Sequence, residues 1–226
     1  MQVNPSRATD RQLPPWRSVL VVVAHPDDES FGLGAVICAF IEAGARVSVL
    51  CFTQGEASTL CDVTGDLAEV RAGELTAAAH VLGMTSVQLL TYADGGLNQV
   101  DATELADHVR SVGHDLSVDG LLVFDTTGIT GHPDHIAATQ AAVDASKTLM
   151  IDVLAWTLSA NVADQLRTEF GADFRGRPSD EIDLTMTVDR TRQRQAVECH
   201  PSQAVPGSAL WRRLDLQGEI EYLRWL

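Results

Sequence analysis

Two short segments of the chain combine histidine with aspartate in a way that could bind a metal ion. Residues 25–29 read His-Pro-Asp-Asp-Glu, and residues 131–135 read Gly-His-Pro-Asp-His. Imidazole nitrogen and carboxylate oxygen are both ligands of divalent cations such as Zn²⁺. A catalytic zinc ion has three protein ligands and leaves one position open for water. Two such segments that meet in space would therefore supply enough ligands for hydrolytic chemistry.

The spacing within each segment indicates how the roles could divide. His132 and His135 are three residues apart at the start of an expected helix, which can place both rings on one side. Both could then bind the metal, or one could bind it while the other lies beside it. Asp27 and Asp28 are neighbours whose side chains diverge, so one can be a ligand while the other acts as a general base.

Each segment also has an ordinary structural interpretation. Adjacent aspartates at a helix N-terminus commonly cap the helix, where the macrodipole favours negative charge. The second segment could be a capped turn with surface histidines. Their joint occurrence after two different expected strands favours the metal site. We expect structural roles for three further histidines on or near expected helices: His80, His108 and His114.

The elements that must position these segments alternate between strand and helix. Buried strands are expected in five continuous apolar and β-branched runs, at residues 18–24, 47–52, 87–91, 120–124 and 151–157. Helical spacing of apolar residues separates them, from Phe31 to a stop at Gly44 and over 67–82, 102–112 and 133–146. Beyond residue 158 the pattern weakens, with an edge strand expected at 183–188 and a helix at 191–199.

This alternation predicts the fold class. Strands that alternate with helices of this length form right-handed βαβ units, so we expect a Rossmann-like, mostly parallel sheet with helices on both faces. We expect a flexible N-terminal tail over residues 1–17 and a single α/β domain over 18–226. In such sheets ligands bind outside the carboxyl ends of the strands. Both histidine segments follow strands and should meet at that edge.

Composition excludes several other classes of protein. The chain has 226 residues, with 31 acidic against 16 basic side chains and a formal net charge of −15. Such a negative chain repels nucleic-acid phosphates and anionic membranes, and no apolar run approaches the roughly 20 residues that span a bilayer. No G-x-G-x-x-G motif follows the first strand, which argues against a dinucleotide-binding module. No G-x-S-x-G motif is present, which argues against a serine hydrolase.

The cysteines indicate a reducing environment. None of the four forms a C-x-x-C pair, and two lie within apolar runs: Cys38, Cys51, Cys61 and Cys199. We therefore expect reduced thiols in a cytoplasmic protein.

The two histidine segments, taken with four further motifs, resemble the PIG-L (LmbE-like) family of zinc-dependent N-deacetylases. The further motifs are Gly55-Glu56 after the second strand, R-x-x-E-L at residues 71–75, Asp94-Gly95 after the third strand, and the alanine-to-H-x-S-Q segment at 196–203. The resemblance covers residues 18–203.

The resemblance implies a role for each matched residue. It implies His25, Asp28 and His135 as the zinc ligands, although ligand type leaves Fe²⁺ or another divalent ion open. It implies Asp27 as the general base on the attacking water, and His132 as the group that stabilises the oxyanion or protonates the departing amine, with Asp134 orienting His132. The positions matched to sugar contacts or to the wall of the site are Glu56, Arg71, Asp94 and His200.

The implied function is removal of an acyl group from the amide nitrogen of a small amino-sugar compound, with an N-acetylglucosaminyl conjugate as the first expectation. Thr130 stands where relatives that act on the mycothiol precursor carry tyrosine, so the sugar and the acyl group stay open. One alternative is an amidase that cleaves a thiol-sugar conjugate or a modified antibiotic at the same metal site. Another is a sugar- or metal-binding domain without turnover. A homo-oligomer also stays open.

Overall fold

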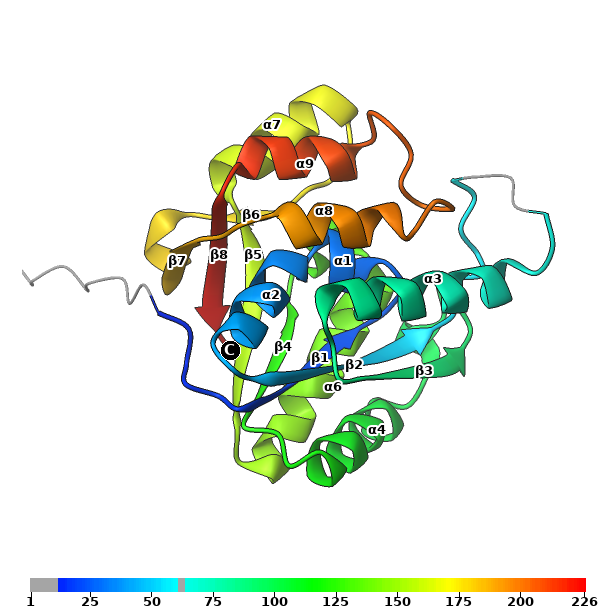
Figure 1. Ribbon diagram of the computed structural model, residues 1–226, viewed down its shortest axis with the longest axis vertical. Coiled ribbons are helices and arrows are strands. Elements are labelled where there is room, and N and C mark those ends of the chain that lie inside the picture. The colour runs from blue at the N-terminus through cyan, green and yellow to red at the C-terminus, as the bar shows by residue number, and fades with distance from the viewer. Residues whose placement is uncertain (1–11, 61–63) are drawn as a thin grey trace, which may run out of the picture.

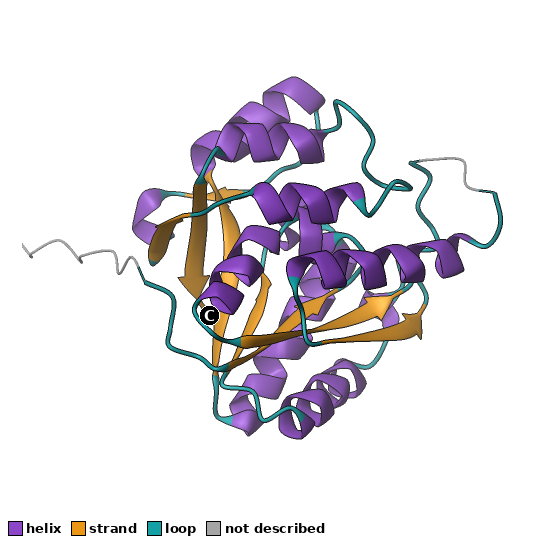
Figure 2. Cartoon of the chain, in the orientation of Figure 1, coloured by secondary structure: helices purple, strands orange, loops and turns teal. Residues whose placement is uncertain are grey.

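The computed structural model of the chain describes residues 12–60 and 64–226, and an eight-stranded sheet forms its centre (Figures 1 and 2). The strands lie in the order β3-β2-β1-β4-β5-β8-β7, and β6 pairs with β5 outside this path. Strands β1 to β5 pair in parallel, whereas β8 is antiparallel to both β5 and β7. The strands are β1 Ser18–Val23, β2 Arg46–Thr53, β3 Ser86–Tyr92, β4 Gly120–Phe124, β5 Asp152–Ser159, β6 Gly176–Arg177, β7 Leu184–Thr187 and β8 Ile220–Trp225.

The central strands are apolar because helices cover both of their faces. All six residues of β1 and all five of β4 are buried. Alternate side chains of β1 enter different cores: Val19 and Val21 join the cluster on one face, and Leu20 joins the cluster on the other. Full burial of such a side chain stabilises the fold by roughly 1.5–3 kcal/mol. The predicted α/β fold class with a mostly parallel sheet is therefore confirmed.

Two layers of helices enclose the sheet (Figure 1). Helices α4 and α6 pack together on one face, where Leu105 and Val109 meet Ala138 and Ala142. Helices α2, α3 and α8 cover the other face. The helices are α1 Asp28–Phe31, α2 Gly34–Glu42, α3 Leu67–Leu82, α4 Ala102–Asp115, α5 Gly128–Gly131, α6 Pro133–Leu149, α7 Ala160–Phe170, α8 Thr191–Glu198 and α9 Ala209–Gln217, with 3₁₀ turns at Leu97–Gln99 and Ser179–Glu181.

Helix α3 has clear sequence signals at both of its ends. The Asp66 side chain caps its N-terminus by accepting a hydrogen bond from the Ala68 N–H at 3.0 Å. Gly83 ends it in a left-handed conformation with φ of 83°, which glycine adopts without a steric cost. The helix therefore spans the predicted residues 67–82.

The C-terminal third contains the elements that the sequence pattern did not predict. Helices α7 and α9 pack on one another, and β8 lies between β5 and the edge strand β7. Strand β8 carries a buried charge, Glu221, which is fully enclosed and interrupts the apolar pattern expected of an inner strand. The predicted edge strand and late helix correspond to β7 and α8.

The start of the described chain packs against the domain. Trp16 stacks on Phe40 with ring centroids 5.7 Å apart and meets Trp225 edge-on at 5.9 Å. Residues 1–11 of the predicted tail lie outside the described residues, as does Cys61. Cys38, Cys51 and Cys199 are free thiols. Within residues 12–60 and 64–226, none of the helices is long and apolar enough to cross a membrane.

A buried ion pair fixes the loop that follows β4. The side chain of Asp125 is fully buried and faces Arg177, whose Nη2 and Nε lie 2.8 and 3.1 Å from its two oxygens. Arg224 approaches the same carboxylate at 3.3 Å. Burial opposes ionisation of Asp125, but the hydrogen bonds from Arg177 and from the Thr127 N–H outweigh it and hold its pKa below the usual value.

We expect Asp125→Asn to lower the free energy of unfolding by about 2–3 kcal/mol at pH 7, because two guanidinium groups lose their buried partner. Since the folded pKa is depressed, this stabilisation is present above the unfolded pKa of about 4 and is lost as pH falls through the folded value. Urea unfolding of both proteins between pH 3 and 7 measures it. Asp107→Asn removes an exposed partner of Arg110 and should change the free energy by less than about 0.5 kcal/mol. An equal loss at both positions would contradict the assignment.

Candidate active site

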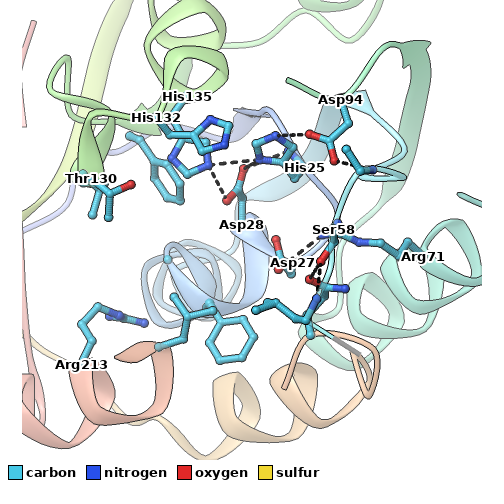
Figure 3. Close-up of a pocket in the computed structure, with 18 of the residues that line it drawn as sticks. His25, Asp27, Asp28, Ser58, Arg71, Asp94, Thr130, His132, His135 and Arg213 are labelled. Atoms are coloured by element: carbon cyan, nitrogen blue, oxygen red, sulfur yellow. Dashed lines mark hydrogen bonds and ion pairs between the residues drawn. The ribbon is translucent and has the colours of Figure 1, made fainter. Parts of the chain in front are cut away.

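Most of the predicted catalytic and metal-binding residues meet in a cavity of about 410 Å³ beyond the carboxyl ends of the parallel strands (Figure 3). Its wall includes residues from the segment after β1, the segment after β4, and the loops after β2 and β3. The predicted residues that line it are His25, Asp27, Asp28, Arg71, Asp94, His132 and His135. The expectation that the two histidine segments meet at one edge of the sheet is therefore confirmed in the geometry.

His25, Asp28 and His135 point three ligand atoms at one another. His25 Nδ1 lies 3.2 Å from His135 Nε2, and Asp28 Oδ1 lies 3.2 Å from the same nitrogen. The other Asp28 oxygen is 3.7 Å from His25 Nδ1. A tetrahedral ion with bonds of about 2.0–2.1 Å separates its ligands by about 3.3 Å. The spacing and the donor types therefore fit a single divalent metal ion.

The second nitrogen of His25 faces two carboxylates. His25 Nε2 lies 3.0 Å from Asp94 Oδ1 and 3.4 Å from Asp134 Oδ2. Burial lowers the pKa of His25, but hydrogen bonds to Asp134, Asp28 and Asp94 outweigh this and raise its pKa to about 12. A metal ion that displaces the proton from Nδ1 would leave the proton on Nε2, donated to a carboxylate, an arrangement common around metal-bound histidine.

His132 completes a cluster of three imidazoles. Its ring stacks on His135 at 4.8 Å and meets His25 edge-on at the same centroid distance. The ligand nitrogens of His25, His132 and His135 lie within 4.8 Å of one another, so this cluster could hold a metal ion. Burial lowers the pKa of His132, and the nearby His135 and His25 lower it further. Neutral imidazole is thereby favoured at this position.

Asp134 contacts His132 through its backbone rather than its carboxylate. The Asp134 N–H donates to His132 Nδ1 at 3.2 Å, as in a helix N-cap. The carboxylate instead accepts from the Gly95 N–H at 2.7 Å and the Leu97 N–H at 3.1 Å, besides its approach to His25. Asp134 thus ties the loop after β3 to the start of α6 and orients rings on both sides of it.

Asp27 has an uncommon backbone conformation. Its φ is 127°, outside the ordinary range for a residue with a side chain, and such strain is held where the surrounding structure over-determines it. The Asp27 N–H donates to Glu29 at 2.9 Å. Burial raises the pKa of Asp27 to about 6; Arg71 opposes the rise and Asp28 adds to it. A carboxylate with a raised pKa beside a candidate metal is a suitable proton acceptor near neutral pH.

Arg71 connects the loops that follow β1 and β2. Its Nη1 donates to the Gly55 carbonyl at 2.6 Å, its Nη2 donates to the Pro26 carbonyl, and Asp27 lies 3.4 Å from Nη2. Gly55 has a φ of 67°, and a Cβ there would clash with the Arg71 guanidinium. The arginine that matched a sugar-contact position also holds Asp27 and its loop in place.

Besides Asp134, two predicted site residues lie outside the cavity wall. Glu56 Oε1 accepts from the Asp94 N–H at 2.9 Å and so positions the loop that carries Asp94. His200 is fully buried behind the site, where its Nε2 lies 2.8 Å from Glu29 Oε1. Among the described residues that line the cavity, neither is found. Their contacts indicate support of the site from behind.

The sequence interpretation missed the apolar wall of the cavity and one cation in it. That part of the wall is formed by residues from α1, from the ends of β4 and β5, from α5 and from the C-terminal third: Phe31, Phe124, Ile129, Trp156, Phe174, Leu210 and Arg213. Trp156 could have been found, because it stands near the carboxyl end of a predicted strand. Arg213 had no local signal, since α9 was not predicted.

Solved structures with this fold include enzymes of more than one kind. A deacetylase of the teicoplanin biosynthesis pathway is similar with a TM-score of 0.70 at 21% identity, covering 92% of this chain and 96% of that one. The 4-carboxy-2-hydroxymuconate hydratase GalB from Pseudomonas putida is similar with a TM-score of 0.62 at 19% identity, covering 93% and 96%. These likenesses define the fold.

Sequence similarity identifies the family. Residues 20–146 match the PIG-L family model, described as GlcNAc-PI de-N-acetylase. A 1D-myo-inositol 2-acetamido-2-deoxy-alpha-D-glucopyranoside deacetylase from Streptomyces avermitilis is 34% identical over 158 residues, which cover 59% of this chain and 54% of that protein. The match thus spans about half the length of this relative. The chain belongs to the PIG-L family, and the resemblance read from its motifs is confirmed.

Proposed function

We propose that this chain is a metal-dependent N-deacetylase that removes an acyl group from the amide nitrogen of a small amino-sugar compound, with an N-acetylglucosaminyl conjugate as the first substrate class. The observation that carries the proposal is the convergence of His25 Nδ1, His135 Nε2 and Asp28 within 3.2–3.7 Å at a cavity that also holds Asp27 and His132. The PIG-L relatives with deacetylase names support the choice of reaction.

His25, Asp28 and His135 would hold the metal, for which we propose zinc, with another divalent ion such as Fe²⁺ also compatible with these ligands. When bound, the ion polarises the amide carbonyl and lowers the pKa of water, because it is a Lewis acid. His132 and the carboxylate of Asp27 lie beside these three proposed ligands. The two hydrogen-bonded carboxylates on His25 Nε2, from Asp94 and Asp134, hold the ring in its binding orientation.

Asp27 is the proposed general base. It would take a proton from the attacking water, and Arg71 at 3.4 Å keeps its carboxylate at the cavity wall. His132, whose Nδ1 accepts the Asp134 N–H, would stabilise negative charge on the former carbonyl oxygen by donating its Nε2–H, or would protonate the departing nitrogen once it has itself been protonated. One well-placed donor to such an oxyanion contributes on the order of 3 kcal/mol. Amide hydrolysis needs these two functions, since an amide is a weak electrophile with a poor leaving group.

Sugar hydroxyls would be bound by the polar side of the cavity. Asp94, Ser58 and Arg71 lie together there in Figure 3, beside the histidine cluster. Asp94 accepts the Ala57 N–H at 3.0 Å through Oδ2. This placement supports a hydroxyl-rich substrate whose amide reaches the cluster.

The test is release of acetate from N-acetylglucosamine derivatives by the full chain, before and after chelation and again after zinc is restored. We expect chelation to remove most activity and zinc to restore it, while His25→Ala stays inactive in all three conditions. Activity that is indifferent to chelator and survives His25→Ala would overturn the proposal. Stoichiometric metal without turnover of any N-acyl sugar would favour a binding domain, and turnover confined to substrates without a sugar would favour an amidase.

A further inference from the structure

The cavity has an apolar side that the deacetylation chemistry does not use. Phe124, Trp156 and Phe174 are each at most 6% exposed and line it, together with Leu210 from α9. Figure 3 shows Arg213 across the cavity from Asp94 and Arg71, with its side chain extending toward the cavity from α9. An apolar substituent would be desolvated on such a surface, whereas the hydroxyl groups of a sugar would find no hydrogen-bond partners on its aromatic and aliphatic side chains.

Arg213 is a buried cation with a free donor. The residue is 2% exposed, and its guanidinium lies over the Trp156 ring at 5.0 Å. Its Nη1 donates to Gln217 Oε1 at 2.6 Å, but the buried Nη2 has no hydrogen-bond partner. An unpaired buried donor is costly, and a charged one more so. A guanidinium at a cavity wall with a free Nη2 is therefore suited to receive an acceptor from a ligand.

Glu221, the carboxylate whose charge acts on Arg213, does not neutralise it. Glu221 accepts hydrogen bonds from Trp156 Nε1 at 2.6 Å and from Gln217 Nε2 at 3.0 Å, and it is ion-paired with Arg190. The charges of Arg190 and Glu221 neutralise one another, so the positive charge of Arg213 has no counter-charge of its own. Burial lowers the pKa of Arg213 to about 10, with Glu221 opposing the shift. The group therefore stays charged at neutral pH.

We propose that Arg213 and the apolar wall around it form a subsite for an oxyanion, so that the substrate carries an apolar group ending in a carboxylate or a phosphoryl group. The guanidinium fork matches the geometry of both anions. The low dielectric of the apolar wall strengthens the attraction, and the substrate supplies the negative charge that Arg213 lacks within the protein. This proposal rests on the proposed function only in assuming that the ligand is the substrate whose amide is hydrolysed; binding of an anion at Arg213 does not depend on it.

Binding of small probes tests the subsite without any turnover. Phenylacetate and its neutral isostere phenylacetamide are titrated into ¹⁵N-labelled protein, and the indole N–H of Trp156 is followed by NMR. We expect phenylacetate to shift this signal and to bind about 10- to 100-fold more tightly than phenylacetamide, the range of one charged hydrogen bond. Phenyl phosphate in a parallel titration distinguishes the two anions. Equal affinity for charged and neutral probes overturns the subsite.

Variants assign the preference to one residue. Arg213→Met keeps an apolar stem but removes the charge, and it should bind both probes equally. Arg212→Met is the matched control, because Arg212 is the neighbour on the same helix and pairs with the exposed Glu169; it should keep the preference. Arg213→Lys keeps the charge without the fork and should keep part of the preference, which guards against misfolding of Arg213→Met. A preference that survives in both Arg213 variants overturns the assignment.

Turnover then locates the anion on the substrate. One pair of substrates differs in the acyl group, N-glutarylglucosamine against N-pentanoylglucosamine, and the other in the aglycone, 4-carboxyphenyl against phenyl N-acetylglucosaminide. We expect an Arg213-dependent advantage of about 10-fold or more in kcat/KM for the anionic member of one pair. No advantage in either pair contradicts the subsite. Absence of all turnover with the probe preference intact would instead contradict the proposed function and leave the subsite standing.

Discussion

Under the proposed ligand assignment, Asp28→Ala should bind no metal ion and should lose nearly all of the proposed deacetylase activity. Asp28 supplies the only carboxylate within 3.7 Å of both His25 Nδ1 and His135 Nε2 among the described contacts, so its removal leaves only neutral imidazole nitrogens, those of His25, His135 and the adjacent His132. Loss of several kcal/mol of charge stabilisation corresponds to about 10³-fold in rate. Elemental analysis of protein purified without chelator gives the metal content, and acetate release gives the rate.

Loss of a metal ligand must be distinguished from loss of the fold. Asp28 accepts the His25 N–H at 2.9 Å, so the variant is compared with wild type by circular dichroism and thermal unfolding. Asp107→Ala, on the exposed surface of α4, is handled in parallel and should keep one ion per chain. Stoichiometric metal in folded Asp28→Ala would show that the two adjacent carboxylates have been assigned the wrong way round.

Asp27→Asn should keep the metal and lose about 10²- to 10⁴-fold in kcat, the range of general acid–base catalysis. Asparagine has the same shape and tolerates positive φ better than most residues, so the strained turn at φ of 127° should persist. KM should change little, since the proton transfer belongs to the chemical step. A variant that releases acetate at the wild-type rate would exclude Asp27 as the base.

The pH profile gives Asp27 a separate signature. The carboxylate accepts a proton only when ionised, so kcat/KM should fall as pH drops through its pKa. Burial raises that pKa to about 6, and the positive charge of a bound ion acts in the opposite direction. The acidic limb of the wild-type profile is therefore expected at or below pH 6 and should be missing from the residual activity of Asp27→Asn. An unchanged limb would assign it to another group.

The parallel half of the fold could be predicted because its signals are local. Continuous apolar runs such as Val19–Val23 mark strands covered on both faces, and a cap such as Asp66 with Gly83 bounds a helix. The rule that ligands bind at the carboxyl ends of parallel strands then placed His25 and His135 together from sequence positions 110 residues apart.

The C-terminal third lacked such signals for a physical reason. Strand β8 is antiparallel and holds the buried Glu221, whose charge is balanced by Arg190 from the segment directly before α8. Such a pair is invisible until the chain is folded. The same holds for the φ of Asp27 and for Asp134, whose carboxylate accepts from the loop after β3 while its N–H contacts the His132 ring. Long-range contacts decide these features.

The most direct test of the metal site is anomalous diffraction at the zinc edge from crystals of the full chain grown with Zn²⁺. We predict a single strong peak within about 2.0–2.2 Å of His25 Nδ1, His135 Nε2 and an oxygen of Asp28. A peak on the other side of His25, between Nε2 and the carboxylates of Asp94 and Asp134, would contradict the assignment, as would a zinc-soaked crystal with no peak in this cavity.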